Sequence, residues 1–551
     1  MNLRLIKMLT LLVILTPLFY SLSFADKDPA TLIIEEKIDE LWTTGTLNIG
    51  YASIASKHWL PNLYERNGYQ LLWQDPQNVT DLLNDIGNIA EDGLNPEDYH
   101  LSQLLVLKLQ LDQNKSLDPL LLSDYDILLT DSLVRLCYHL QFGKVDPENL
   151  YPTWNMTRQI HNKNPVVAIE KRLQTGSLAE GLKNIRPKTH LYQMLKALLK
   201  KYREIQEAGG WETMPKGPTL KPGMTDGRIA LLRKRLAITG EYEGSVSDAD
   251  YYDEPLKEAV QRFQIKHRLE ADAAVGKNTL AALNIPVKQK IDQIRVNLER
   301  IRWVYHKMPP DFIAVDIAGF QVYHVEDIDI SWSSRAQVGK PFRKTPVFKS
   351  KIKYIVFNPT WTVPPTILQK DILPKIKKNP DYLHKMKISV IDREGRTVDP
   401  KSVNWSKYSK NIPYTLRQEP GPHNALGRMK FIFPNKYFIY LHDTPSRSLF
   451  GRKDRAFSSG CIRVENDLEL AEILLADPVK WDRQSILEVL DTNETRRVYL
   501  PKPKSIILFY ATIRFDKIDN YIFKKDIYDR DRRVLEGLNE EFTIWQTRAI
   551  N

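Results

Sequence analysis

Apolar residues recur at helical spacing along most of the first 200 residues. Between 79 and 90, six of them fall on one helical face: Val79, Leu82, Leu83, Ile86, Ile89 and Ala90. The same spacing predicts further helices near 101–112, 124–142, 165–184 and 189–206. No catalytic constellation accompanies these helices, so we expect residues 26–215 to form a helical scaffold domain.

A stretch dense in glycine and proline, residues 209–227, is typical of a linker. Two short amphipathic helices follow in "RIALLRKRLAITG" and "PLKEAVQRFQIKHRL", and Pro255 suits the first turn of the second. A third helix is predicted in "GKNTLAALN". We therefore expect residues 216–290 to form a small three-helix domain.

From about residue 310 the apolar pattern changes to the period of two that is typical of strands. "DFIAVDIAGFQVYHV" alternates around an Ala-Gly turn, and "MKFIFPNKYFIYLHD" predicts two strands joined at Pro434-Asn435. These signals predict a mainly β domain over 305–500, followed by a C-terminal extension, 501–551, that packs on the scaffold or catalytic domain. The predicted fold class is multidomain α+β.

A lysine-rich segment, "TILQKDILPKIKKNPDYLHKMK", has a helical pattern and interrupts the strands. We expect a helical capping insertion at about 366–420. A lid over the β domain and a solvated appendage are both compatible with this pattern.

The N-terminus joins two basic residues, an apolar run and the small-residue triplet that ends at Ala25. This order is typical of a secretory signal peptide over residues 1–25, although an uncleaved membrane anchor fits as well. We expect an exported, periplasmic protein, with membrane contact only through this segment if it is not removed.

Composition indicates an ordinary globular protein of several domains, with 551 residues, 42% hydrophobic and 27% charged. The net charge of +11 is spread along the chain without a long Lys/Arg block, which argues against a nucleic-acid partner. A positive charge suits an acidic partner, and the carboxylates of cell-wall stem peptides are one candidate.

The chain has two cysteines, Cys137 and Cys461, and a single disulfide between them is the simplest structural explanation. Cys137, however, lies on the apolar stripe of the helix predicted at 124–142, where a cysteine packs as a small hydrophobe. Cys461, in "AFSSGCIRV", has no such stripe around it.

An exported thiol is oxidised unless it is buried, bridged or used, and a used thiol needs a base. His442 ends the "YFIYLHDTP" strand, so it can meet Cys461 if the two segments are neighbours in one sheet. The N–H groups of Gly460 and Cys461 could face the oxyanion, and Arg463 could hold a substrate carboxylate or favour the thiolate. The sequence therefore predicts a nucleophile, Cys461, and a general base and acid, His442.

Two segments resemble known families. "LKEAVQRFQIKHRLEADAAVGKNTLAALN" is similar to the peptidoglycan-binding domain type 1, with Arg268 and Ala273 where that family often has glycine. "HDTP" followed by twelve residues and "SSGCIRV" resembles the L,D-transpeptidase catalytic domain of the YkuD type. The whole arrangement resembles the long periplasmic YcbB-like branch, as do "FNPTWTVPPTI", "GPHNALGRMKFIFPN" and "LPKPKSIILFYAT".

This resemblance implies acyl transfer on peptidoglycan without a cofactor or a metal. Cys461 would attack the third stem residue, release the terminal D-alanine and pass the acyl group to another stem amine, giving a 3→3 cross-link. The resemblance also implies acylation of Cys461 by carbapenems, and other cell-wall synthesis proteins are conceivable partners. Further pocket residues would be Ser459, Tyr440, Trp361, Asn358 and Asn424.

Ser459 stands where many members of the family have a second histidine, which leaves His442 as the single candidate base. One question stays open at the site, namely which group orients the His442 ring. The candidates are Tyr440, Ser459 and a backbone carbonyl.

Other functions are less well supported. A catalytic zinc site is poorly supported, because the sequence has no HExxH motif and no paired cysteines. A non-catalytic wall-binding protein would leave the set of His442, Gly460, Cys461 and Arg463 unexplained. Within the enzyme class, water as acceptor gives an L,D-carboxypeptidase and a protein lysine gives an anchoring enzyme. The three-helix domain could bind glycan or serve as a spacer.

Overall fold

The computed structural model describes residues 27–113, 118–156, 169, 171, 173, 177–244, 249–304, 308–327, 329–379, 381–517 and 520–541. The expected signal segment and most of the helix predicted at 165–184 lie outside this part of the chain. The chain divides into two compact units, Met1–Pro76 with Ser102–Asp131 and Gln77–Leu101 with Ser132–Asn551. Among the described helices, we find none with the length and apolar character needed to cross a membrane.

The first unit is a small helical assembly. It contains α1 (Pro29–Thr44), α2 (Leu60–Arg66), most of α4 (Leu101–Gln113) and the first half of α5 (Pro119–Phe142). Asp126 on α5 organises its interior, because its carboxylate accepts the Tyr64 hydroxyl at 2.6 Å and the Leu72 N–H at 2.9 Å. Burial raises the pKa of Asp126 to about 6.

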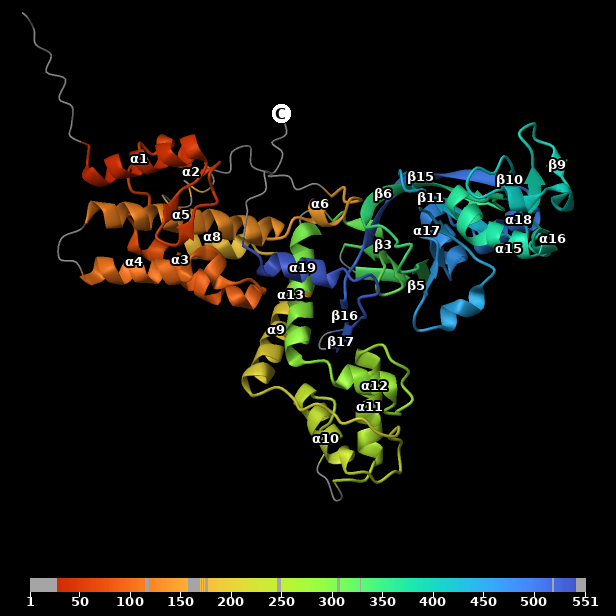
Figure 1. Ribbon diagram of the computed structural model, residues 1–551, viewed down its shortest axis with the longest axis horizontal. Helices are drawn as coiled ribbons and strands as arrows, with labels where there is room; N and C mark the ends of the chain where they lie inside the picture. The colour runs from red at the N-terminus through yellow and green to blue at the C-terminus, as the bar shows by residue number, and fades with distance from the viewer. Residues whose placement is uncertain are drawn as a thin grey trace, which may run out of the picture. The chain divides into compact units, whose positions relative to one another are not determined.

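The second unit begins with helices that pack around α13 (Val287–Val304). α9 (His190–Glu207) lies along α13 (Figure 1), while α3 (Pro76–Asn88) and α8 (Leu178–Ile185) belong to the same unit. The sequence pattern did not predict α13. Its apolar stripe is interrupted by polar residues that the fold buries in ion pairs and hydrogen bonds, among them Asn297, Glu299 and Arg302.

The three helices predicted for the small domain are present as α10 (Arg228–Thr239), α11 (Glu254–Lys266) and α12 (Lys277–Leu283). Their core includes Leu232, Leu236 and Phe263. Arg268 and Ala273 have φ values of +55° and +59°, a left-handed conformation that favours glycine. Arg268 contacts the sheet of the same unit, since its Nη1 donates to the carbonyls of Ala318 and Gly319 at 3.1 and 3.0 Å.

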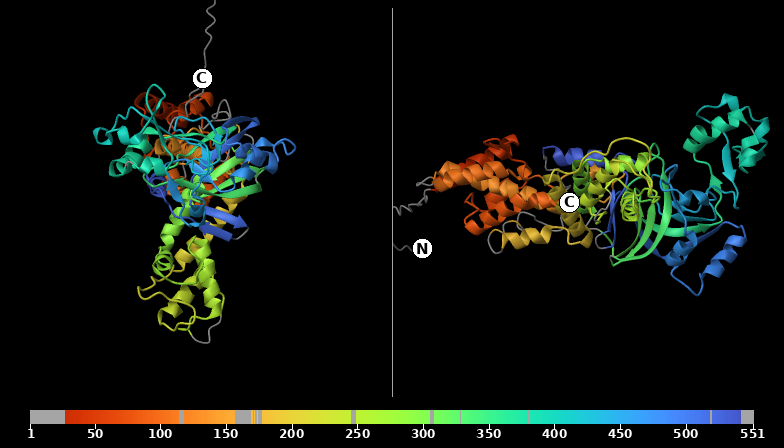
Figure 2. Two further views of the ribbon diagram at one scale, coloured as in Figure 1. Left: turned by 90° about the vertical axis from the view of Figure 1, so that its right-hand side faces the viewer. Right: turned by 90° about the horizontal axis from the view of Figure 1, so that it is seen from below.

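A nine-stranded mixed sheet forms the centre of the second unit (Figure 2). In spatial order its strands are β13 (Ala456–Ser458), β5 (Asp329–Gly339), β14 (Ile462–Val464), β12 (Leu441–His442), β11 (Met429–Ile432), β6 (Phe348–Phe357), β15 (Arg496–Phe509), β3 (Asp311–Asp316) and β4 (Gln321–Glu326). β4 also pairs with β5, so the sheet closes on itself. Its core includes residues of α17 (Asp467–Leu475) and α18 (Arg483–Asp491). The predicted α+β fold class is confirmed.

The domain boundary that we expected at residue 500 falls inside β15. This strand lies between β6 and β3 in the sheet, so residues up to Phe509 belong to the β domain. The following hairpin, β16 (Ile513–Lys517) with β17 (Asn520–Phe523), packs with α9 and α13 in one apolar core. α19 (Asp531–Asn539) also contacts α13.

The insertion is helical only in its first half, which corrects the prediction of a helical cap. It begins with α14 (Pro365–Ile367), the π-helical turn η4 (Leu368–Ile372), α15 (Leu373–Lys378) and α16 (Asp381–Lys385). A four-stranded sheet completes it, in the order β7 (Trp361–Thr362), β10 (Thr415–Gln418), β8 (Ser389–Ile391) and β9 (Thr397–Val398). These strands have two to four residues, too few to give a clear alternation. The insertion has its own apolar core.

Candidate active site

Two adjacent parallel strands bring Cys461 and His442 together. β12 pairs with β14 so that Leu441 lies beside Ile462 and His442 beside Arg463. Cys461 immediately precedes β14, and the Ile462 N–H donates to the Tyr440 carbonyl at 3.1 Å. The two segments are thus neighbours in one sheet, the arrangement that a cysteine and histidine pair requires.

The ring of His442 is buried and fixed by the backbone. Its Nδ1 lies 2.5 Å from the Asp443 carbonyl, and because a carbonyl only accepts, Nδ1 carries the hydrogen and Nε2 is left as the basic nitrogen. A backbone carbonyl is therefore the group that orients the ring. Burial, reinforced by the nearby Arg463 charge, lowers the pKa of His442 to about 3, so the imidazole is neutral at pH 7.

The Cys461 thiol is half-buried and free of any disulfide. Its Sγ lies 3.7 Å from the Phe438 carbonyl. Burial raises the pKa of this thiol, and hydrogen bonding to Tyr440 together with the charges of Lys430 and Arg463 opposes that rise. The resting pair is consequently a neutral thiol beside a neutral imidazole, and the thiolate has to be generated at the moment of attack.

Lys430 is a residue of this site that the sequence reasoning missed. It lies on β11 directly opposite His442, and its Nζ is 3.9 Å from the centre of the Tyr440 ring. Tyr440 in turn meets the His442 ring edge to face, with centroids 5.5 Å apart. Burial lowers the pKa of Lys430. A single lysine inside the apolar run "MKFIF" was the available signal.

Arg463 occupies the register position next to His442, on the other side from Lys430. Its Nη1 donates to Gln337 Oε1 at 3.1 Å on β5. Its Nε is buried and has no hydrogen-bond partner among the residues that the structure describes. Lys430 and Arg463 thus place two cationic side chains on either side of the histidine, which favours an anion at this point of the sheet.

The predicted oxyanion role of the Gly460 N–H needs correction. This N–H donates to Ser458 Oγ at 3.1 Å, and the Gly460 carbonyl accepts from Thr345 Oγ1 at 2.8 Å, so the N–H and the carbonyl of Gly460 both have partners. Gly460 instead provides a φ of +125°, a conformation open to glycine. Within the described part of the chain, the Cys461 N–H has no acceptor, which makes it the backbone donor available to an oxyanion.

Ser459 is exposed and does not orient the His442 ring. Its Oγ accepts a hydrogen bond from Arg343 Nη1 at 2.8 Å. The same guanidinium makes a bidentate ion pair with Asp371 on η4 of the insertion. Ser459 therefore belongs to a contact between the nucleophile loop, residues 458–461, and the insertion.

Three predicted pocket residues make structural contacts. Asn358 is buried and left-handed, and its Nδ2 donates to the Val489 carbonyl at 3.1 Å. Asn424 is buried, and its Nδ2 donates to the Pro359 carbonyl at 2.8 Å. Trp361 packs against the apolar core of the insertion. A sequence motif identifies such residues as important but does not distinguish a buried amide that holds a loop from one that faces a substrate.

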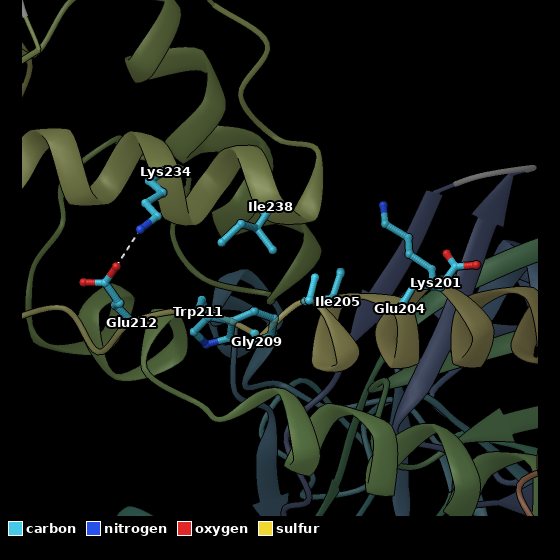
Figure 3. A pocket seen from close by; sticks show the side chains of 10 residues that line it. Lys201, Glu204, Ile205, Gly209, Trp211, Glu212, Lys234 and Ile238 are labelled. Carbon is cyan, nitrogen blue, oxygen red and sulfur yellow. Dashed lines mark hydrogen bonds and ion pairs between the residues drawn. The ribbon is translucent and has the colours of Figure 1, made fainter.

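Two other features lie apart from this site. Asp311, His324 and Glu326 cluster closely enough to suggest a cation site, but Lys504 Nζ already lies 2.7 Å from Asp311 Oδ1 and 3.3 Å from His324 Nε2. A cavity of about 660 Å³ lies between the end of α9 and α10 (Figure 3). Across it Lys234 and Glu212 form an ion pair of 2.6 Å, and Trp211 lines its wall.

Comparison with known families assigns the parts of the chain. Residues 310–480 match the L,D-transpeptidase catalytic domain. This region includes both His442 and Cys461, so the match agrees with the resemblance of the motif around Cys461 to that domain. Residues 225–283 match the "Putative peptidoglycan binding domain", and residues 58–199 match the scaffold domain.

A curated protein from Haemophilus influenzae, described as a "Putative L,D-transpeptidase", is 37% identical over 245 residues. The match covers 44% of this chain and 48% of the relative, so the chain spans about half the length of that protein. Solved L,D-transpeptidase structures from Xylanimonas cellulosilytica and Stackebrandtia nassauensis are 15% and 13% identical. They cover 54% and 53% of this chain and 99% and 94% of their own, with TM-scores of 0.17 and 0.20.

Proposed function

We propose that this protein is a peptidoglycan L,D-transpeptidase that works through a cysteine acyl-enzyme outside the cytoplasm, in the periplasm. The observation that carries the proposal is the pairing of β12 with β14, which sets His442, with Nε2 as its basic nitrogen, beside the Cys461 segment. The match of residues 310–480 to the catalytic domain supports the same class of reaction.

In the first half of the reaction, His442 Nε2 takes the thiol proton as Cys461 Sγ attacks the carbonyl carbon of the third stem residue. A base in contact with the nucleophile is needed because the raised thiol pKa leaves little thiolate at neutral pH. The tetrahedral oxyanion would accept from the Cys461 N–H. Its collapse breaks the peptide bond, and the imidazolium returns the proton to the departing amine of D-alanine.

In the second half, the side-chain amine of another stem attacks the thioester. His442 takes a proton from that amine, the carbon–sulfur bond breaks, and the protonated imidazole restores the Cys461 thiol. The product is a 3→3 cross-link. Lys430 and Arg463, on either side of His442, would attract the carboxylates of the donor stem.

The test is incubation of the protein with tetrapeptide muropeptides and mass analysis of the products. We expect tetrapeptide dimers that lack one D-alanine, and no product with Cys461→Ser. The control variant is Cys137→Ser, which changes the other thiol and should keep the activity. Tripeptide as the sole product would identify a carboxypeptidase. The absence of any product from folded protein would contradict the proposal that the protein is an enzyme.

A further inference from the structure

The loop between β5 and β6, residues 340–347, holds the residue before the nucleophile. Thr345 Oγ1 donates to the Gly460 carbonyl at 2.8 Å and accepts the Gly339 N–H at 2.9 Å. A turn within the loop, from the Arg343 N–H to the Lys340 carbonyl at 2.8 Å, sets the position of Arg343. This loop and the nucleophile loop are therefore fixed to each other.

The Arg343 side chain extends this connection to the insertion. Its Nη1 donates to Ser459 Oγ at 2.8 Å, and its Nη2 donates to Asp371 Oδ1 at 2.9 Å, while Nη1 also contacts the other oxygen of that carboxylate. The side chain is 13% exposed. A planar guanidinium in a bidentate pair has a fixed orientation, so the position of Asp371 determines where the donor to Ser459 points.

Asp371 belongs to a body with its own interior. Its neighbours Leu368 and Ile372 on η4 are buried in the apolar core of the insertion, together with Leu416 of β10. A displacement of this body would move the carboxylate with it. Among the described residues, the Arg343 side chain bonds both to this carboxylate and to the nucleophile loop, so it can transmit such a displacement.

The nucleophile loop depends on external support. Gly460 has a φ of +125°, and because a glycine can adopt many other conformations as easily, hydrogen bonds from the surroundings have to fix the loop. Errors of about 1 Å in the position of a reacting group can reduce a rate by about 10²-fold. A contact next to Gly460 can therefore influence the reaction strongly, although a solvated ion pair by itself adds little stability.

We propose that Arg343 is a positioning residue that couples the insertion to the nucleophile loop, so that the placement of the insertion determines the attack geometry of Cys461. The proposal rests on the proposed function for its consequence in acyl transfer. In this proposal the Ser459 hydroxyl accepts the hydrogen bond from Arg343 through which the coupling acts.

The test compares Arg343→Gln, Asp371→Asn, Ser459→Ala and the double variant of Asp371 and Ser459. Acyl transfer from a tetrapeptide donor should fall at least tenfold in Arg343→Gln and severalfold in each other single variant. Because both partners act through Arg343, the double variant should be no slower than the slower single variant. The matched control is Asp381→Asn, which removes an exposed ion pair with Lys401 elsewhere in the insertion and should leave the rate unchanged.

A second measurement follows the thiol itself. Iodoacetamide alkylation of Cys461, located by peptide mass mapping, gives the pH midpoint of the thiol without any peptidoglycan reaction. A released loop lets the thiol leave the buried site that raises its pKa, so the midpoint should fall in Arg343→Gln while acyl transfer slows. A merely structural ion pair would leave the midpoint unchanged.

The variant Arg343→Lys keeps the proposal falsifiable if Arg343→Gln does not fold. Lysine keeps the positive charge but cannot bind both Asp371 oxygens and Ser459 in one fixed orientation, so acyl transfer should fall and the thiol midpoint should shift in the same direction as expected for Arg343→Gln. Unchanged midpoints and rates in all variants, or additive effects of Asp371→Asn and Ser459→Ala, would overturn the coupling. Shifted midpoints in a protein that processes no muropeptide would instead contradict the proposed function and support the coupling.

Discussion

At the scale of single residues, the site depends on two groups whose charges burial suppresses. The His442 imidazole and the Cys461 thiol are both neutral at rest, because removal from water disfavours the ionised form of each. A neutral pair differs from a preformed thiolate–imidazolium pair in its response to pH. The two kinds of pair therefore give different pH dependences of the free energy of unfolding and of the reaction rate.

We expect acid to destabilise the wild-type protein more than His442→Gln. The unfolded histidine, with a pKa of about 6.5, binds a proton that the native ring, with a pKa of about 3, does not bind. Stability therefore falls as the pH drops below about 6.5, at about 1.4 kcal/mol per pH unit, until the native ring titrates.

Denaturant unfolding at several pH values between 4 and 7 measures this difference. The His442→Gln curve should lose this part of the slope, whereas a His384→Gln control, at an exposed position of the insertion, should follow the wild type. Parallel curves for the wild type and His442→Gln would mean that the native ring titrates with the same pKa as the unfolded histidine.

At the scale of elements, the apolar periodicity of the sequence predicted the helices and strands that are long enough to show a clear pattern. α10, α11, β3 and β4 follow from amphipathic patterns of 6 to 13 residues, and they are present where expected. α13 and the sheet of the insertion were missed, because the first buries charged residues in specific pairs and the second consists of strands too short for a pattern. Tertiary contacts, absent from any local window, define both.

The candidate site divides in the same way. The positions of Cys461 and His442 in neighbouring strands agree with what a motif and a strand pattern suggest. Thr345 and Arg343 could not be found in this way, since they reach the nucleophile loop from a segment more than a hundred residues away. The direction of the Gly460 N–H likewise depends on a local side chain, Ser458.

The nucleophile loop gives a prediction about backbone geometry. In Gly460→Ala, the new Cβ would meet Ile439 Cδ1 at 3.2 Å and the residue would keep an unfavourable φ of +125°. We expect a loss of about 1–3 kcal/mol in stability and at least a tenfold loss of acyl transfer, because the loop must shift.

Gly421→Ala is the matched control for this variant. Its φ is +140° and no atom lies within 4 Å of the added Cβ, so it carries the backbone cost without the contact. Denaturant unfolding should give similar stabilities for the two variants. Muropeptide turnover should fall only in Gly460→Ala. Equal turnover would mean that the loop geometry does not limit the reaction.

At the scale of the whole second unit, ion pairs in dry surroundings connect segments that are distant in sequence. Lys524, just after β17, lies 2.7 Å from the Asp316 carboxylate at the end of β3, and both side chains are 2% exposed. Asp316 also accepts the Gly319 N–H at 2.9 Å. The C-terminal hairpin is thereby connected to the nine-stranded sheet.

We expect Lys524→Met to destabilise the protein by about 3–5 kcal/mol, because it leaves a buried carboxylate without its partner. Adding Asp316→Asn should recover a large part of that loss, since the carboxylate charge is then removed as well. Denaturant unfolding of the wild type, both single variants and the double variant gives the coupling energy. Additive losses would show that the pair is solvated.

The place of β15 in the sheet has a consequence for the order in which the protein matures. This strand joins β6 to β3, yet it follows Cys461 along the chain, and the later Tyr528 hydroxyl donates to the Gly339 carbonyl at 2.5 Å and accepts the Thr345 N–H at 3.1 Å. A chain that emerges from the ribosome with its N-terminus first therefore has the thiol before it has the strand that joins β6 to β3 and the tyrosine that holds Gly339 and Thr345. These contacts around the loop before Cys461 form only after residue 528 has emerged, so the proposed active site assembles at a late stage of synthesis.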